Sequence, residues 1–341
     1  MTSKAKFKVV KLHFNSPLHI SDNRSDYGVS LRTIQSDTLY AAVISCLAKL
    51  GIPIPEDGDL GCTVSSLFPF YQKNMEDKAV YFFPLPLKMQ LPSTGNAKAI
   101  KKIQWVDLGY FQIIINGESD VFNNISDIKN VYLTSSSLSS VNGEGTYDFI
   151  TSTVVPRVKV SRSFEDAEPF YMDRVSFADN SGLFFIVVGD TSLLETGLEL
   201  LQYEGIGTDR NVGNGYFNYT TDDIEIDIPD NANAAVGLSM FIPASKDQLD
   251  ELMNGENIAY DFTRRGGWIT DSPYNTFRKN AIYSFLPGSV YSSKKRDIEV
   301  SGKIVNLCPD VDRAVFYRKG IEVLSHPIWR CGRSIFIPVI I

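Results

Sequence analysis

Cysteine and histidine are scarce in this sequence, and neither residue forms a cluster. The chain has four cysteines and three histidines among 341 residues. No two cysteines stand at Cys-x-x-Cys spacing, and the histidines do not gather around them. Zinc sites and disulfide frameworks need such spacing, so we expect buried or free thiols, no bound metal and no cofactor.

Long apolar runs and an excess of positive charge are missing as well. No stretch approaches the roughly 20 apolar residues of a membrane span, and no apolar segment follows the charged residues 1–7. We therefore expect a cytoplasmic protein with no membrane partner. The net charge of −7 argues against a protein that coats nucleic acid nonspecifically. Any polyanion would have to be held by a local basic patch.

Core-forming residues, by contrast, are plentiful, and their patterns predict a mixed α+β fold. Residues 7–14 read as a half-buried strand, 36–51 as a helix that ends at a glycine, and 183–188 as a buried strand. The pair Ser192 and Glu195 forms a capping box that predicts the start of a second helix. Strand, helix and strand thus occur twice in the first part of the chain, which indicates a ferredoxin-like sheet.

The length of the chain exceeds what one hydrophobic core usually supports, so we expect two domains. The acidic, proline-bearing span 220–233 is typical of a boundary. We place an N-terminal domain at residues 1–225 and a C-terminal domain at residues 226–341. The second domain, with a capping box at Ser245–Gln248 and many short strands, is the more degenerate α+β unit.

Two prolines precede a polar insertion in the first domain. Pro84 and Pro86 lie in a predicted strand, residues 80–87, and indicate an edge strand or the exit of the chain from the sheet. Residues 88–150 follow as the insertion, and we expect poor order in part of it.

Residues 154–162 alternate apolar and basic side chains, with Arg157, Lys159 and Arg162 on one face. Residues 169–177 could return antiparallel to them and carry Arg174. This pattern predicts a protruding β-hairpin with a cationic face. The alternative is an ordinary solvated strand face.

Residues 205–217 contain four glycines within eleven positions and an arginine, Arg210, between the glycine pairs. Glycine adopts positive φ freely and lets a ligand approach the backbone, so the run suggests a loop whose N–H groups face an anion or a flat ring. The predicted order is helix, loop, strand. Dinucleotide-binding and Walker loops run in the opposite order and are excluded. A tight structural connection remains the alternative.

Six motifs in this order resemble the RAMP-superfamily subunit of type III-A CRISPR effectors that caps the 5′ end of the guide RNA, the fourth Csm protein. The motifs are residues 16–20 (Ser-Pro-Leu-His-Ile), 36–39 (Ser-Asp-Thr-Leu), the glycine loop, 264–268 (Arg-Arg-Gly-Gly-Trp), 278–290 and 326–332 (His-Pro-Ile-Trp-Arg-Cys-Gly). The resemblance spans nearly the whole chain. One departure is that Thr208 and Asp209 replace a glycine and a lysine that are common in relatives, whereas Arg210 is kept.

The resemblance implies an α+β protein with two ferredoxin-like (RRM-like) domains, the second degenerate. It implies that the protein grips the 5′ tag of the guide RNA and joins the large polymerase-like subunit to a backbone RAMP subunit. The family is not regarded as catalytic. The candidate RNA-binding residues are Gly205, Gly207, Arg210, Asn211, Gly213, Gly215, His19, Ser36, Arg157, Lys159, Arg162, Arg174, Arg264, Arg265, Trp268, Arg278 and Lys279.

Two other functions remain open. A metal-independent guide-processing ribonuclease needs an acid and a base, for which His13 and His19 are candidates, although structural roles are favoured for both. Asp22, Asp26 and Asp37 could be a metal cluster, but a helix cap explains Asp37 and loop formation the other two. A protein-only scaffold is the third possibility. It could use the aromatic residues between Trp268 and Tyr291 as interface anchors, although core packing explains most of them equally well.

Overall fold

The computed structural model describes residues 2–21, 27–74, 76–87, 97–118, 122, 125–136, 138, 149–159, 167–293 and 295–341. The fold is a mixture of helices and sheets built on one large sheet. Among the described residues no helix is both long and apolar enough to cross a bilayer.

The large sheet has the strand order β11-β1-β10-β3-β4-β5-β7-β6, and β2 also pairs with β10. Its strands are β1 (Thr2–Phe14), β2 (Cys62–Val64), β3 (Phe68–Tyr71), β4 (Val80–Pro84), β5 (Trp105–Asp107), β6 (Ile128–Lys129), β7 (Tyr132–Leu133), β10 (Ser181–Gly189) and β11 (Phe217–Pro229). All neighbours are antiparallel except β5 and β7.

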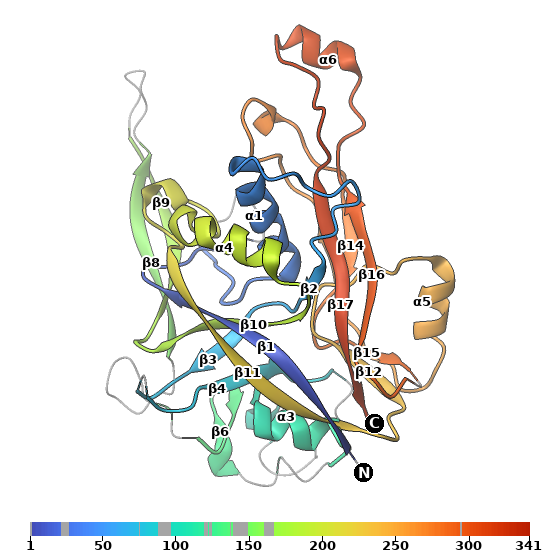
Figure 1. The fold of residues 1–341 in the computed structure, drawn as a ribbon. Coiled ribbons are helices and arrows are strands. Elements are labelled where there is room, and N and C mark those ends of the chain that lie inside the picture. The colour runs from blue at the N-terminus through green and yellow to red at the C-terminus, as the bar shows by residue number, and fades with distance from the viewer. Residues whose placement is uncertain are drawn as a thin grey trace.

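Helices cover both faces of this sheet. The helices α1 (Ser36–Lys49) and α4 (Ser192–Glu204) lie on one face, and α3 (Leu108–Ile115) lies on the other (Figure 1). Along β1, Val10 packs in the core that contains α1 and α4, whereas Val9 packs in the core that contains α3. Successive side chains of a strand point to opposite faces, so one strand serves two cores.

The C-terminal part forms a second sheet with the order β15-β12-β17-β16, and it packs into the core on the α3 side. Its strands are β12 (Ala234–Gly237), β15 (Val290–Ser292), β16 (Glu299–Asn306) and β17 (Trp329–Val339). A separate ribbon pairs β13 (Phe262–Arg265) with β14 (Ile282–Phe285). The short helices are α2 (Ala97–Ile100), α5 (Lys246–Leu252), α6 (Arg313–Arg318), η2 (Ile125–Asp127), η3 (Arg210–Val212) and η4 (Tyr274–Thr276).

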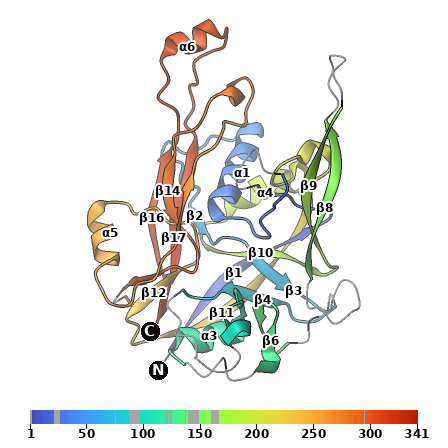
Figure 2. The same ribbon diagram turned by 180° about the vertical axis from the view of Figure 1, so that it is seen from behind.

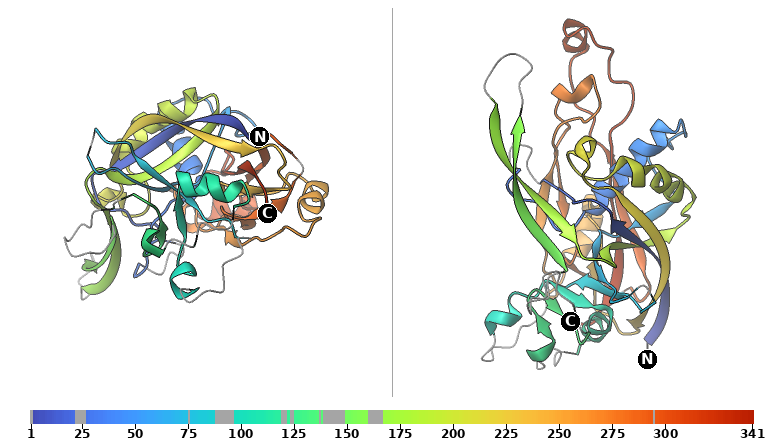
Figure 3. Two further views of the ribbon diagram at one scale, coloured as in Figure 1. Left: turned by 90° about the horizontal axis from the view of Figure 1, so that it is seen from below. Right: turned by 90° about the vertical axis from the view of Figure 1, so that its left-hand side faces the viewer.

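Two projections rise from the same side of the molecule. One is the hairpin of β8 (Ile150–Lys159) and β9 (Glu168–Phe177), and the other is an arm that carries α6 (Figures 1 and 2). The side view in Figure 3 also shows both extending beyond the body of the protein. The helices α1 and α4 lie at the base between them (Figure 1).

Several predicted elements are confirmed. The first strand, the helix from Ser36, the buried strand β10 and the antiparallel hairpin are all present. The Ser245 cap of the C-terminal part is present too, because its hydroxyl accepts a hydrogen bond from the backbone amide of Gln248. The Gln248 side chain reaches back to the backbone amide of Ala244, one residue before the cap, so the box is only half formed.

The capping box at Ser192 was wrong. The N-cap residue of α4 is Thr191, and no side chain caps the helix. The Ser192 hydroxyl donates to Asp190, and Glu195 instead accepts from Thr191 and from Lys8 on β1. A strand that lies beneath the helix supplies the lysine, so tertiary contact decided the role of Glu195.

Of the two interpretations of residues 80–87, the edge strand was wrong, whereas the exit of the chain from the sheet is confirmed. β4 lies inside the sheet, between β3 and β5. Pro84 is the last residue of the strand, where a missing N–H costs least. The insertion supplies the further strands: Val106 on β5 and Phe111 on α3 are fully buried, so its described parts add to the core. Residues 88–96 and 139–148 of it lie outside the described residues.

Candidate nucleic-acid interface

The glycine loop, residues 205–216, joins α4 to β11 and is bonded to the segment that follows β1. The amide of Thr208 donates to the carbonyl of His19 at 3.0 Å, and the amide of Gly215 donates to the carbonyl of Pro17 at 2.9 Å. A third bond, from Ile206 to the carbonyl of Gly215, closes the loop on itself at 3.0 Å. Two distant motifs of the sequence thus form one backbone platform.

The glycines of this loop have different reasons to be glycine. A Cβ on Gly207 would lie 2.5 Å from the carbonyl oxygen of His19, and one on Gly215 would lie 2.0 Å from that of Ile206. Both positions therefore need glycine for close backbone packing. Gly213 has a φ of +92° with no atom within 4 Å of an added Cβ, so its side of the loop is open. Gly205, like the first two, is closely packed, in its case against Asn214.

Backbone donors stand open at the tip of the loop. The amides of Asp209, Arg210 and Asn211 donate to no acceptor within the described part of the chain. Arg210 itself is only partly buried, and its guanidinium makes one long contact, 3.5 Å, with the carbonyl of Gly205. The tip therefore offers three N–H groups and one cation to an anion.

Two hollows flank this tip. The first has a volume of about 520 Å³ and is lined by the loop, which includes Tyr216, by Tyr203 and Glu204 at the end of α4, and by Thr270 of the C-terminal part. The second, of about 360 Å³, lies between Asp209 and the far end of the hairpin strands, where β8 ends at Lys159 and β9 begins at Glu168; Tyr27 and Phe170 also line it. Asp209 borders both hollows, so the loop tip forms the ridge between them.

The two faces of the hairpin differ. Lys159 and Phe170 line the second hollow, and Arg174 reaches the loop, where its Nη2 donates to Asn214 Oδ1 at 2.8 Å. Arg157 lies opposite Phe170 and so shares this inner face. On the outer face Val154, Val158 and Tyr171 are exposed. Arg162 lies outside the described residues.

His19 and Ser36 do not present their side chains to a ligand. His19 has no exposed surface and its Nδ1 lies 2.7 Å from the carbonyl oxygen of Asp173. Ser36 is 3% exposed, and its hydroxyl accepts from the amide of Met240 in the C-terminal part. Both side chains hold the surrounding backbone in place, because burial leaves them no access to solvent.

His13 is the other histidine on which a ribonuclease hypothesis would rest. It is half-buried on β1, with Nε2 3.2 Å from the Thr220 hydroxyl and the ring against Phe70. Burial, and to a lesser degree Lys11, lowers the pKa of His13 below its ordinary value. No carboxylate within the described residues is bonded to it.

Asp37 was predicted as a helix cap, and that was wrong. The N-cap of α1 is Gln35, and the Asp37 carboxylate is fully buried beneath two arginines of the C-terminal part. Arg265 donates to it from Nε at 2.8 Å and from Nη2 at 2.9 Å, and Arg330 donates from Nη1. Burial opposes ionisation of Asp37, but Arg330 and Arg265 outweigh it and hold the pKa of the carboxyl below its usual value.

We call Asp37, Arg265, Lys279 and Arg330 the basic junction. Lys279 belongs to it because the charges of the other three act on its ammonium group. Arg264 does not belong to it. Successive residues of β13 point to opposite faces, so Arg264 lies beside Tyr283 on the exposed side of the ribbon.

Trp268 and Arg278 form a pair of their own in the segment beyond this ribbon. They bridge the two strands of the segment, and the Arg278 guanidinium lies 4.9 Å from the centre of the Trp268 ring. This cation–π contact accounts for both residues structurally, and Arg278 also remains exposed.

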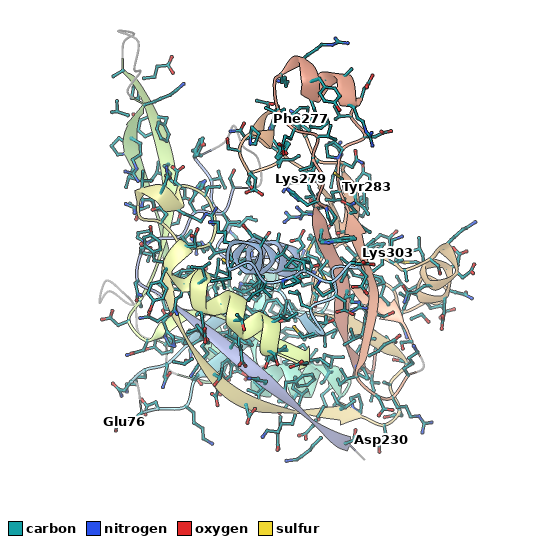
Figure 4. All side chains as sticks on the ribbon, turned by 45° about the horizontal axis from the view of Figure 1, so that its top comes forward. Glu76, Asp230, Phe277, Lys279, Tyr283 and Lys303 are labelled. Atoms are coloured by element: carbon teal, nitrogen blue, oxygen red, sulfur yellow. The ribbon has the colours of Figure 1, made fainter. Side chains whose placement is uncertain are left out.

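The aromatic residues of the C-terminal part divide into core and surface. Phe277 stacks on Phe316 in a small core of the arm, and Tyr291 is fully buried in another. Tyr283 is 62% exposed, beside Phe262. Figure 4 shows Phe277 within the arm and Tyr283 on its outer side. Core packing therefore explains many of these residues, whereas Tyr260, Phe262, Tyr283 and Tyr317 are exposed.

No group of three metal-ligating side chains occurs in the described ranges. Asp22 and Asp26 lie outside them. Sequence reasoning also missed several residues of the interface, which are Tyr27, Tyr203, Asn214, Tyr216, Thr270 and Arg330. Arg330, Asn214 and Tyr216 had a usable signal, since Arg330 stands in the motif at 326–332 and the other two stand in the glycine loop.

Comparisons with known proteins agree with this fold. Residues 230–339 match the family model of the CRISPR Csm4 C-terminal domain. The protein Csm4 of the CRISPR system of Streptococcus thermophilus is 25% identical over 293 residues, which are 81% of this chain and 85% of that protein. Csm4 of Thermococcus onnurineus (strain NA1) is 22% identical over 255 residues, 69% of this chain and 75% of that protein.

Two solved structures share the fold over nearly the whole chain. A chain of the Csm3–Csm4 subcomplex of the type III-A CRISPR-Cas interference complex matches with a TM-score of 0.58 at 16% identity, covering 98% of this chain and 99% of that one. A chain of the Csm1–Csm4 cassette in complex with cA4 matches with a TM-score of 0.54 at 16% identity, covering 98% of each chain. The α+β architecture with a large sheet is therefore shared with those chains.

Proposed function

We propose that this chain is a Csm4 subunit of a type III-A CRISPR interference complex, in which it holds the 5′ tag of the guide RNA. The match to the Csm4 C-terminal domain and the two Csm4 relatives support this assignment. In the same complex it bridges the large polymerase-like subunit, Csm1, and the backbone RAMP subunit, Csm3. The Csm1–Csm4 and Csm3–Csm4 assemblies of similar chains support both contacts.

The loop tip carries the RNA-binding part of the proposal. Three open amides and Arg210 stand on a ridge between two hollows, and Lys159 faces one of the hollows. Amides and cations bind phosphates, whereas aromatic rings stack on splayed bases of single-stranded RNA. Tyr203 and Tyr216 on one side of the ridge provide such rings, as do Tyr27 and Phe170 on the other.

The strand order supports a ferredoxin-like N-terminal domain. Its four central strands run β11-β1-β10-β3, with α1 after β1 and α4 after β10, which is the split βαβ arrangement. We place the boundary after Pro229 instead of at residue 225, because β11 pairs with β1 along its whole length. The C-terminal order, β15-β12-β17-β16, differs from the N-terminal one, so we regard that domain as a distant variant.

We propose that the subunit has no catalytic role of its own. Cleavage of RNA without a metal needs a base and an acid that reach the 2′-hydroxyl and the leaving oxygen. His19 is buried, and His13 lacks a bonded carboxylate within the described residues. A complex with His13→Ala should therefore process guides normally, and an assembled variant that does not would favour the ribonuclease.

The test of RNA binding uses the reconstituted complex. Arg210→Glu should release guide RNA from the purified complex while the subunit stays folded. Lys246→Glu, the same charge change on exposed α5, is the control and should retain the guide. If Arg210→Glu and Gly213→Val both retain the guide, the loop is not the binding site. Pull-downs after nuclease treatment test the bridge, and recovery of neither partner subunit would reject it.

A further inference from the structure

Lys279 is a partly buried cation of the basic junction. Within the described residues its ammonium group has no hydrogen-bond or ion-pair partner. Removing a charge from water without pairing it costs free energy, so proteins rarely retain such a lysine for stability alone. The position therefore points to a binding partner outside the folded chain.

The surroundings make the excess of positive charge larger. Asp37 on α1 is already shared by Arg265 on β13 and Arg330 on β17, and the side chains of these arginines are only 16% and 10% exposed. The other carboxylate that acts on Lys279 is Asp271, which is exposed to solvent and therefore screened. Among the described residues, the charges that act on Lys279 are therefore two arginines, one buried carboxylate and one exposed carboxylate.

Burial and the neighbouring charges change the pKa of the Lys279 ammonium group. Burial, followed by repulsion from Arg330, lowers the pKa of Lys279 to about 8, from the ordinary value of 10.5. The folded protein therefore carries an uncompensated electrostatic cost at neutral pH. An anion bound beside Lys279 would remove that cost.

The chain connects this junction to the glycine loop. The amide of Lys279 donates to the carbonyl of Gly267, and the amide of Ile269 donates to the carbonyl of Phe277. The next residue, Thr270, lines the hollow beside Arg210. Lys279 is thus about three residue steps, roughly 10 Å, from that hollow along an extended segment. Figure 4 shows Lys279 on the side of the arm toward α1, and Lys303 on the opposite side.

We propose that Lys279, in the field of Arg265 and Arg330, binds one phosphate of the guide-RNA tag, next to the phosphates held by the glycine loop. This inference rests on the proposed function. An RNA strand fits better than an acidic protein segment, because the adjoining hollow offers open amides and aromatic rings that suit a nucleotide strand.

The experiment compares reconstituted complexes that carry Lys279→Met with wild-type complexes. Guide RNAs with a single uncharged methylphosphonate at each position of the 5′ tag serve as probes. Loss of one charge-assisted phosphate contact should weaken guide binding by about 10- to 100-fold. One methylphosphonate position should cost the wild type about the same factor and cost the Lys279→Met complex nothing more. Additive effects at every position would overturn the proposal.

Two controls distinguish a phosphate contact at Lys279 from a general loss of positive charge and from a loss of stability. Lys303→Met removes an exposed lysine from β16 and should leave guide binding unchanged. The melting temperature of the Lys279→Met subunit should stay the same or rise, because an unpaired cation is removed. A lower melting temperature together with unchanged guide binding would show a structural role and overturn the proposal.

Three further outcomes can be told apart. If Lys279→Met prevents assembly with the partner subunits after nuclease treatment, the anion is a protein carboxylate and the RNA assignment is wrong. If Arg210→Glu releases the guide and Lys279→Met does not, this inference alone fails. If both variants keep the guide at full affinity, the proposed function fails with it.

Discussion

The glycine loop and the basic junction are cationic places that the chain builds by opposite means. At the loop, backbone amides supply most of the donors, and Arg210 is accompanied by the acidic Asp209. At the junction, two arginine side chains from distant segments converge on Asp37. A backbone site keeps its shape when charges change, whereas a side-chain site depends on its central carboxylate. The two places should therefore respond differently to substitution.

The largest effect on folding free energy should come from neutralising Asp37, the central carboxylate of the basic junction. Asp37→Asn leaves two buried guanidinium groups without their counter-ion and should cost about 3–5 kcal/mol of folding free energy. The matched control is Glu204→Gln, which breaks the more exposed Lys49–Glu204 pair beside the loop and should cost less than about 1 kcal/mol. Denaturant titration of both variants measures this, and equal costs would refute an anchoring role for Asp37.

The next largest effect concerns two glycines of the loop, whose replacement by alanine should reduce stability by different amounts. Gly207→Ala places a Cβ 2.5 Å from the carbonyl oxygen of His19 at a φ of +100°, so we expect a loss of about 3 kcal/mol or more. Gly213→Ala meets open space and should cost about 1 kcal/mol through its positive φ alone. Thermal melts give the ranking. The reverse order would mean that the loop packs differently.

The pH dependence of guide affinity should distinguish the basic junction from the glycine loop. Lys279, whose pKa is about 8, binds a phosphate only when protonated, so guide affinity should fall up to tenfold from pH 7 to pH 9. The charged groups that face it are Asp37, Asp271, Arg265 and Arg330. Lys279→Arg should flatten the profile. Arg210→Lys at the loop should leave it unchanged.

The folding stability of the RNA-free subunit should rise with pH, whereas guide affinity falls. The pKa of Lys279 is lower in the folded state than in the unfolded state, where it is near 10.5. The unfolded chain therefore binds the extra proton between pH 8 and about pH 10.5, and this group makes the folded state more stable as the pH rises through that window. In Lys279→Met that contribution should disappear from the denaturation curves.

The smallest effect should come from the hairpin. Arg157→Ala with Lys159→Ala should lower the salt dependence of guide binding by roughly 1.4 in slope if each contacts one phosphate, because single strands give about 0.7 per contact. Val154→Ser with Val158→Ser on the outer face should leave that slope unchanged. An unchanged slope for the first pair would mean that the inner face is merely solvated.

Local patterns predicted the elements well and their neighbours poorly. The alternation around Arg157 indicated the hairpin correctly, because period and strand length are properties of a short segment. The same reasoning failed for β4, which Pro84 suggested to be an edge. Whether a strand is an edge depends on what pairs with it, and its second partner, β5, comes from the insertion.

The candidate site shows the same division. The glycine run indicated a loop of open backbone, and the loop has one. Glycine content could not say which glycines serve packing, because the atoms that crowd Gly207 belong to residue His19, far away in the chain. Nor could it reveal Tyr203 or Thr270, which are unremarkable in the sequence and become neighbours of Arg210 only after folding.

The sequence by itself determined the α+β composition, the helix–loop–strand order around the glycines and the presence of a basic hairpin, since each depends on residues a few positions apart. Only the tertiary structure decided which charged side chains are buried and which of them pair with one another. Asp37 reads as a cap from its position at the start of a helix, but burial makes an unpaired carboxylate too costly there, and the arginines that pair with it lie more than 200 residues away. Coulomb energy depends on distance in space and on exposure to water, and neither quantity is written in the local sequence.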